Sequence, residues 1–213
     1  MGRWKELTSC YGEAGPAMGF ASGPVTLRFL VDNRGSTTEV LVTETQLGSY
    51  EAERCLLAVG RTISFPRPQG NATAQIEYTL EFRSTGAIAV MELAPAELEL
   101  ELPALHARLA AACEHLGADE VAATLYIDAQ GTVRSIGLAS ASAIDDEAGT
   151  CVSGAIRRWN VRLPAVQGGV GRVTVPLRSA DLIASRDRAP ELKRYSRTSG
   201  PPRARPRRGR VRR

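Results

Sequence analysis

The sequence has few residues of the kinds that carry metal or redox chemistry. Its 213 residues include two histidines and four cysteines, and the cysteines form no CxxC pair. No histidine stands at zinc-finger spacing from a cysteine. His106 and His115 are nine positions apart, which predicts solvated residues on different faces of one helix. We therefore expect no metal site, and the cysteines can be either buried thiols or disulfides.

Long apolar runs are also missing. No window approaches the roughly 18 consecutive apolar residues of a membrane span. The first ten residues, MGRWKELTSC, lack the apolar stretch of a secretory signal. We expect no transmembrane segment in this chain, which as written resembles a soluble protein. Its 43% apolar content is enough to build one or two hydrophobic cores.

The motifs of common enzymes are absent as well. The sequence contains no GxSxG, HExxH or GxxxxGK[ST], and no GxGxxG after a predicted strand. The glycine-rich stretch QGGVGR at 167–172 precedes a strand rather than a helix, so it does not predict a phosphate site. Asp145, Asp146 and Glu147 fit the first turn of a helix better than a metal site. We expect a non-catalytic protein with no cofactor and no small-molecule substrate.

Positive charge gathers at the C-terminal end. Residues 186–213 hold 12 of the 27 lysines and arginines and two acids, so their net charge is +10, against −6 for residues 1–185. The last stretch, GPPRARPRRGRVRR, is too rich in Pro, Gly and Arg to bury a core, which predicts a disordered tail. Tyr195 is the one aromatic residue in 186–213, which argues against stacking on nucleic-acid bases. The arginines that could bind an anionic polymer are Arg203, Arg205, Arg207, Arg208, Arg210, Arg212 and Arg213.

Two stretches of the sequence repeat one pattern. FLVDNRG ends at Gly35 and LYIDAQG ends at Gly131, and a cysteine follows each glycine after twenty positions, at Cys55 and Cys151. Apolar alternation before each glycine and a second apolar stretch after it predict a hairpin. The cysteine then lies on the apolar face of a predicted helix. A third strand follows, which the first copy shows most clearly at Ala72–Phe82.

The repeat predicts an α+β fold made of two tandem units. Each unit would have a leading helix followed by β-β-α-β, with a three-stranded antiparallel sheet and its helices against one face. The predicted boundaries are residues 1–84 for the first unit, 85–102 for a connection, 103–182 for the second unit and 183–213 for the tail. Pro176 cannot donate to a sheet, which predicts an edge strand, or the end of a strand, at that position.

A second cysteine precedes the first strand of each unit, at Cys10 and at Cys113. If the leading helix lies beside the cysteine-bearing helix, the disulfides Cys10–Cys55 and Cys113–Cys151 can form. Four ordinary buried thiols are the alternative. Disulfides would require an oxidising compartment, whereas no export signal is visible. A start codon assigned too late would reconcile the two and place the protein in the periplasm or cell envelope; otherwise it is cytoplasmic.

The first unit resembles a known family. The stretch from GPVTLRF to YTLEF is similar to the C-terminal domain of TonB-like proteins. More narrowly, Cys10-Tyr11, Cys55 and Phe65-Pro66 resemble the AgmX/PglI C-terminal domain of myxobacterial and related envelope proteins. The resemblance covers Leu7–Phe82 and, more weakly, Leu105–Leu177. It implies a non-catalytic module in the cell envelope that acts in TonB-type transduction, gliding motility or adhesion.

The second unit departs from this family pattern at two places. Glu114 stands where Tyr11 would be expected, and Leu163-Pro164 stands where Phe65-Pro66 would be expected. Family members usually also carry an N-terminal membrane anchor and a long spacer, and we expect neither in this chain.

The resemblance also implies how a partner would bind. TonB-like domains bind extended segments at a sheet edge through main-chain hydrogen bonds. The strand Ala72–Phe82 is the best candidate, and the residues on its polar face are Thr73, Gln75, Glu77, Thr79 and Glu81. We expect a protein partner in the cell envelope, unless the other unit covers this strand. The alternative function is binding of nucleic acid, acidic polysaccharide or anionic lipid through the basic tail.

Overall fold

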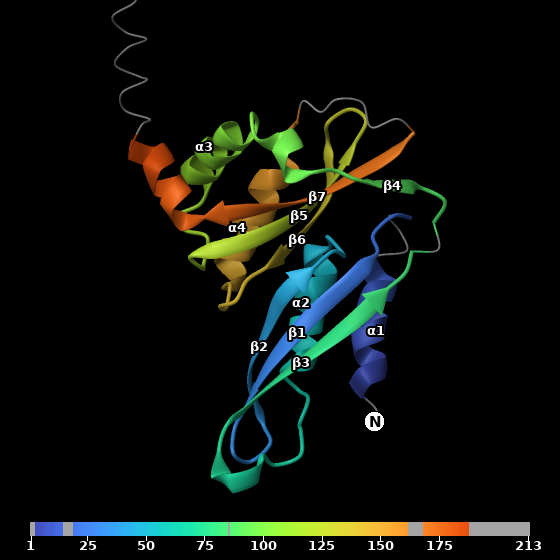
Figure 1. The fold of residues 1–213 in the computed structure, drawn as a ribbon, viewed down its shortest axis with the longest axis vertical. Helices are drawn as coiled ribbons and strands as arrows, with labels where there is room; N and C mark the ends of the chain where they lie inside the picture. The colour runs from blue at the N-terminus through green and yellow to red at the C-terminus, as the bar shows by residue number, and fades with distance from the viewer. Residues whose placement is uncertain (1–2, 15–18, 85, 162–167, 188–213) are drawn as a thin grey trace, which may run out of the picture.

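The first sheet has three antiparallel strands. β1 (Gly23–Val31) lies in the centre, between β2 (Thr37–Thr45) and β3 (Ala74–Phe82). Helices α1 (Arg3–Ala14) and α2 (Tyr50–Gly60) cover one face, behind the strands in the view of Figure 1. The apolar residues that alternate along β1 are buried on this face, as the sequence predicts: Val25, Leu27, Phe29 and Val31. This computed structural model describes residues 3–14, 19–84, 86–161 and 168–187.

The second sheet has the same arrangement with one strand added. β5 (Glu120–Asp128) lies between β6 (Val133–Ala139) and β7 (Gly169–Arg178), as β1 lies between β2 and β3. Helices α3 (Leu102–Ala112) and α4 (Asp146–Arg157) pack on one face of this sheet. The chain is therefore α+β, with two sheets whose three shared strands follow the same order.

The segment between the two units is more than a connection. Residues 85–102 include β4 (Ala89–Glu92), which pairs in parallel with β7, and a 3-10 helix, η3 (Pro95–Leu98), which leads into α3. The second sheet is thus four-stranded and mixed, so the expectation of a three-stranded antiparallel sheet was wrong here. The four residues of β4 are too few for a recognisable alternation, and their pairing with β7 defines the strand. Pro176 lies beyond the part of β7 that β4 pairs with, where its missing N–H costs least.

The two hairpin turns have the same hydrogen bonds, 96 positions apart. Oδ1 of Asp32 accepts from the backbone N–H groups two and four residues later, and Oδ1 of Asp128 does the same. Gly35 has a φ of 88° and Gly131 a φ of 78°, a backbone conformation that favours glycine. The backbone carbonyl of Asp32 also accepts from the N–H of Gly35, at 3.0 Å. The backbone carbonyl of Asp128 accepts from the N–H of Gly131 in the same way, at 2.9 Å. The repeat in the sequence is therefore a repeat in structure at these turns.

Each turn is also tied to the segment that follows the second helix of its unit. The carbonyl of Gly35 accepts from Phe65 N and that of Gly131 accepts from Val161 N, both at 2.8 Å. Val161 thus takes the place of Phe65 in the second unit, because a 96-residue offset relates all four residues. Leu163-Pro164, which the sequence comparison placed there, lies outside the described residues.

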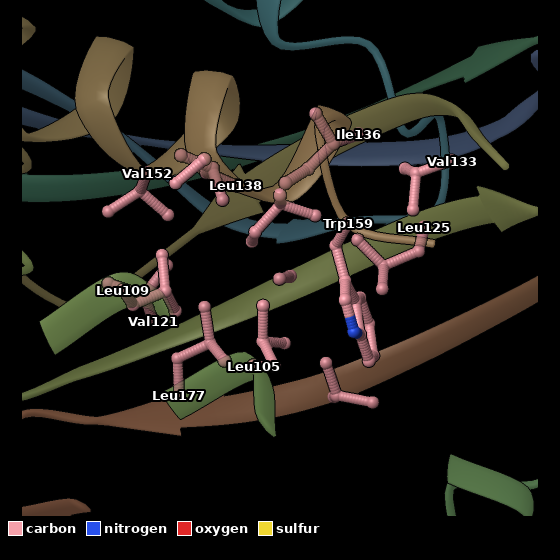
Figure 2. Close-up of a cluster of buried hydrophobic side chains, with 14 of the residues drawn as sticks. Leu105, Leu109, Val121, Leu125, Val133, Ile136, Leu138, Val152, Trp159 and Leu177 are labelled. Atoms are coloured by element: carbon pink, nitrogen blue, oxygen red, sulfur yellow. The ribbon is translucent and has the colours of Figure 1, made fainter. Parts of the chain in front are cut away.

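Each unit has its own apolar core. Figure 2 shows the core of the second unit, where side chains from α3, α4 and the sheet gather in one cluster that includes Trp159, which is 4% exposed. A disulfide closes each core: Cys10–Cys55 and Cys113–Cys151 have Cα–Cα distances of 5.5 and 5.7 Å. Both predicted pairings are confirmed, because in each unit the leading helix packs beside the helix that carries the second cysteine.

A last helix, at residues 179–187, corrects the expected start of the tail. Leu182 is 2% exposed and belongs to the second core. Nε of Arg186 donates to Ala110 O at 2.9 Å, and Nη2 donates to the carbonyls of Cys113 and Glu114. Carbonyls at a helix end need such partners, so these residues belong to the fold. The boundary expected at residue 183 was therefore placed too early.

Candidate functional site

The two units meet at a buried interface rich in hydrogen bonds. Tyr126 on β5 is fully buried, and its hydroxyl lies 3.0 Å from both Ser22 O and Gln46 O in the first unit. Oγ1 of Thr124 donates to Thr45 O at 2.7 Å. The second sheet is thus covered on both faces, by its own helices on one side and by the first unit on the other. This explains why the sequence of β5 is apolar with little alternation.

Glu53 on α2 is a carboxylate inside this interface. It is 1% exposed; Oε1 accepts from Oγ1 of Thr45 and Oε2 accepts from Leu138 N of the second unit, each at 2.7 Å. Burial raises the pKa of Glu53 to about 7, although these hydrogen bonds act in the opposite direction. Gly137 makes room for the carboxylate, because a Cβ there would lie 2.2 Å from Oε1. Glu53 therefore bonds the two units to each other.

Neither Glu53 nor Tyr126 was predicted from the sequence as an interface residue. A glutamate in a helix is usually solvated, and a tyrosine in a strand usually packs within its own unit. The one available signal was the position of Glu53 on the same helical face as the apolar Leu56 and Leu57, three and four residues later.

The hollow beside Glu53 is too small for a substrate. It lies between α2, β2 and residues 138–146, and its interior volume is about 40 Å³, which is room for a few water molecules. Among the described residues, no group of three or more His, Cys, Asp or Glu side chains could hold a metal ion. The interface therefore has the character of a structural joint.

The sheet edges are the remaining candidates for binding, and they differ in length and cover. β2 and β6 face each other across the interface, where Ser140 N donates to Val42 O at 2.8 Å. β4 is an edge of the second sheet with four residues. β3 has nine residues, and within the described part of the chain it pairs with β1 alone. The long open edge of the molecule is thus that of β3.

The hydrogen bonds of β1 show which residues of β3 face this edge. The carbonyl of Pro24 accepts from Gln46 N, so even-numbered residues of β1 point their backbone groups towards β2. Odd-numbered residues such as Leu27 point towards β3, where Leu27 lies opposite Tyr78. Even-numbered residues of β3 therefore bond to β1. The residues whose backbone N–H and C=O groups point to the open edge are Gln75, Glu77, Thr79 and Glu81.

These four residues are also the ones predicted from the sequence as a polar face. They are exposed, and two of them contact β1: Nε of Arg28 donates to Glu77 at 2.9 Å, and the hydroxyls of Thr26 and Thr79 lie 3.0 Å apart. Thr73, the fifth predicted residue, is exposed just before the strand, which begins at Ala74 rather than Ala72.

The expectation of two solvated histidines is met at His115, which is exposed, and not at His106. His106 on α3 is partly buried, and burial lowers its pKa, whereas a solvated position was expected. His115 follows the end of α3, where its Nδ1 accepts from Gly117 N at 3.0 Å. The arginines predicted to bind polyanions, from Arg203 to Arg213, lie outside the described residues. Among the described residues, no helix is both long and apolar enough to cross a bilayer.

Comparisons with known protein families, with curated proteins and with solved structures found no match for this chain.

Proposed function

We propose that this chain is a protein-binding module that captures an extended segment of its partner by strand addition at the open edge of β3. The observation that carries the proposal is the contrast between β3 and the other edges. β2 and β6 are taken up by the interface between the units and β4 is short, while β3 offers nine residues. Unpaired main-chain groups along such an edge are a template for another strand.

Two further observations support a binding role over catalysis. The hollow beside Glu53 is small, and the carboxylate in it already accepts hydrogen bonds from Thr45 and Leu138. The buried interface also gives the edge strand a stable support, because it joins the first unit to the second. A rigid edge binds a partner strand with less loss of entropy than a mobile one.

The setting that we propose is the cell envelope. The two disulfides favour an oxidising compartment, since such bonds are rare in reducing ones. The resemblance of the first unit to TonB-like and AgmX/PglI C-terminal domains points the same way, towards an adaptor in envelope transduction, gliding motility or adhesion.

Blocking the edge tests the proposal. In Thr79→Pro the outward N–H is lost while the bonds from β3 to β1 remain. Thr79→Val is the matched control, because it removes the same hydroxyl and keeps the N–H. Extended peptides of about ten residues are titrated into isotope-labelled protein, and amide shifts are followed by NMR. We expect shifts centred on β3 in the wild type and in Thr79→Val, and none in Thr79→Pro. Shifts centred elsewhere, or equal binding by Thr79→Pro, would refute strand addition.

A further inference from the structure

The inner side of β3 is apolar and only partly covered. Tyr78 lies opposite Leu27 of β1, and Leu27 is fully buried whereas Tyr78 is 45% exposed. Ile76, opposite the fully buried Phe29, is also partly exposed. Helices α1 and α2 therefore cover the centre of the sheet and leave part of the apolar side of β3 exposed. A strand added to the edge would bring side chains next to Ile76 and Tyr78.

The outer side of the first sheet is acidic. Residues of β2 and β3 that lie opposite even-numbered residues of β1 share this side, and they include Glu39, Glu44, Glu77 and Glu81. Arg28 is the one basic residue in the three strands, and it is paired with Glu77. Glu81 lies opposite Pro24, which has no charge to offset it. Two carboxylates thus stand on the edge strand itself, with Arg28 beside Glu77 and with Arg83 directly after the strand.

We infer that the edge of β3 selects an extended peptide in which basic residues alternate with apolar ones. Successive side chains of a strand point to opposite faces, so an added strand presents one set to Glu77 and Glu81 and the other set to Ile76 and Tyr78. Opposite charges in adjacent strands attract, whereas like charges repel. This inference rests on the proposed function, since it names the partner of the same edge.

The test uses three peptides of about ten residues with the same apolar residues at alternate positions. The other positions carry lysine, threonine or glutamate. Affinity for the full chain is measured by fluorescence anisotropy at physiological salt, where charges farther apart than about 8 Å are largely screened. We expect the lysine peptide to bind about 10-fold more tightly than the glutamate peptide, with the threonine peptide between them, from two cross-strand charge pairs.

Charge-matched variants show whether β3 itself makes the choice. The variant Glu77→Gln/Glu81→Gln removes the two acids next to the added strand, about 5 Å away. The control Glu39→Gln/Glu44→Gln removes two acids from the same sheet face on β2, about 14 Å from the added strand and beyond the screening length at physiological salt. We expect the preference for lysine to fall to about 2-fold or less in the first variant and to persist in the control.

The outcomes separate the inference from the proposed function. If all three peptides bind equally and shift the β3 amides, the inference is wrong and strand addition stands. If the two double variants lose the preference equally, overall charge rather than the edge is responsible, and the inference again fails. If no peptide shifts the β3 amides, the proposed function fails and the inference with it.

Discussion

Replacing Glu53 by glutamine should change how the stability of this protein depends on pH. Burial raises the pKa of Glu53 to about 7, against 4.5 for an exposed glutamate. Between these two values the native state holds a proton that the unfolded chain releases. The contribution of Glu53 to the free energy of unfolding should therefore be greatest below pH 4.5, and it should be lost as the pH rises through 7.

The size of the effect follows from the pKa difference. A shift from 4.5 to about 7 corresponds to roughly 3 kcal/mol between the low and high pH limits. Glutamine at position 53 is neutral at every pH, and its side-chain oxygen can still accept from Leu138 N. The Glu53→Gln variant should thus lack this contribution, and its stability relative to the wild type should improve by about 3 kcal/mol from pH 4.5 to pH 8.

Urea unfolding at a series of pH values measures this difference. Trp159 is 4% exposed in the second core, so its fluorescence reports unfolding. Glu44→Gln is a suitable control, because Glu44 is exposed on the outer face of the first sheet. Parallel stability curves for the wild type and Glu53→Gln would refute the reasoning, since the carboxylate would then titrate alike in both states.

Four other perturbations test the rest of the structure. The double variant Cys10→Ser/Cys55→Ser should lose about 4 kcal/mol in urea unfolding, because the disulfide spans 45 residues; a loss under about 1 kcal/mol would contradict that account. Tyr126→Phe should lose about 1 kcal/mol, since its hydroxyl bonds to the first unit, and an unchanged midpoint in urea would contradict this role. Deleting residues 188–213, whose net charge is +10, should leave thermal unfolding unchanged and abolish retention on heparin at low salt. Arg186→Ala should instead lower the melting temperature, because Arg186 caps α3.

Local features of the fold could be predicted from the sequence because nearby residues determine them. The turns at Gly35 and Gly131 need a positive φ, and the strand before Gly35 alternates with a period of two. Helix starts were also predictable: Ser49 and Asp145 each accept from a backbone N–H three residues later. The disulfides could be inferred because the repeat placed one cysteine on each of two neighbouring helices.

Part of the candidate site was predictable in the same way. The alternation from Gln75 to Glu81 identifies a polar face without any knowledge of the fold. Whether the edge of that strand is open depends on where the second unit lies, and no local pattern contains that information. The structure shows that the second unit packs against α2 and β2 and over one end of the first sheet, while within the described residues β3 pairs with β1 alone.

Contacts between residues far apart in the chain were decided by the tertiary structure alone. Glu53 bonds to Leu138, Tyr126 to Ser22, and β4 exists because it pairs with β7. In the sequence these residues have the composition of a solvated helix, an ordinary strand and a linker. Their roles arise because the two units bury surface against each other, and burial makes a carboxylate, a hydroxyl or a short extended segment depend on partners that only the folded chain brings near.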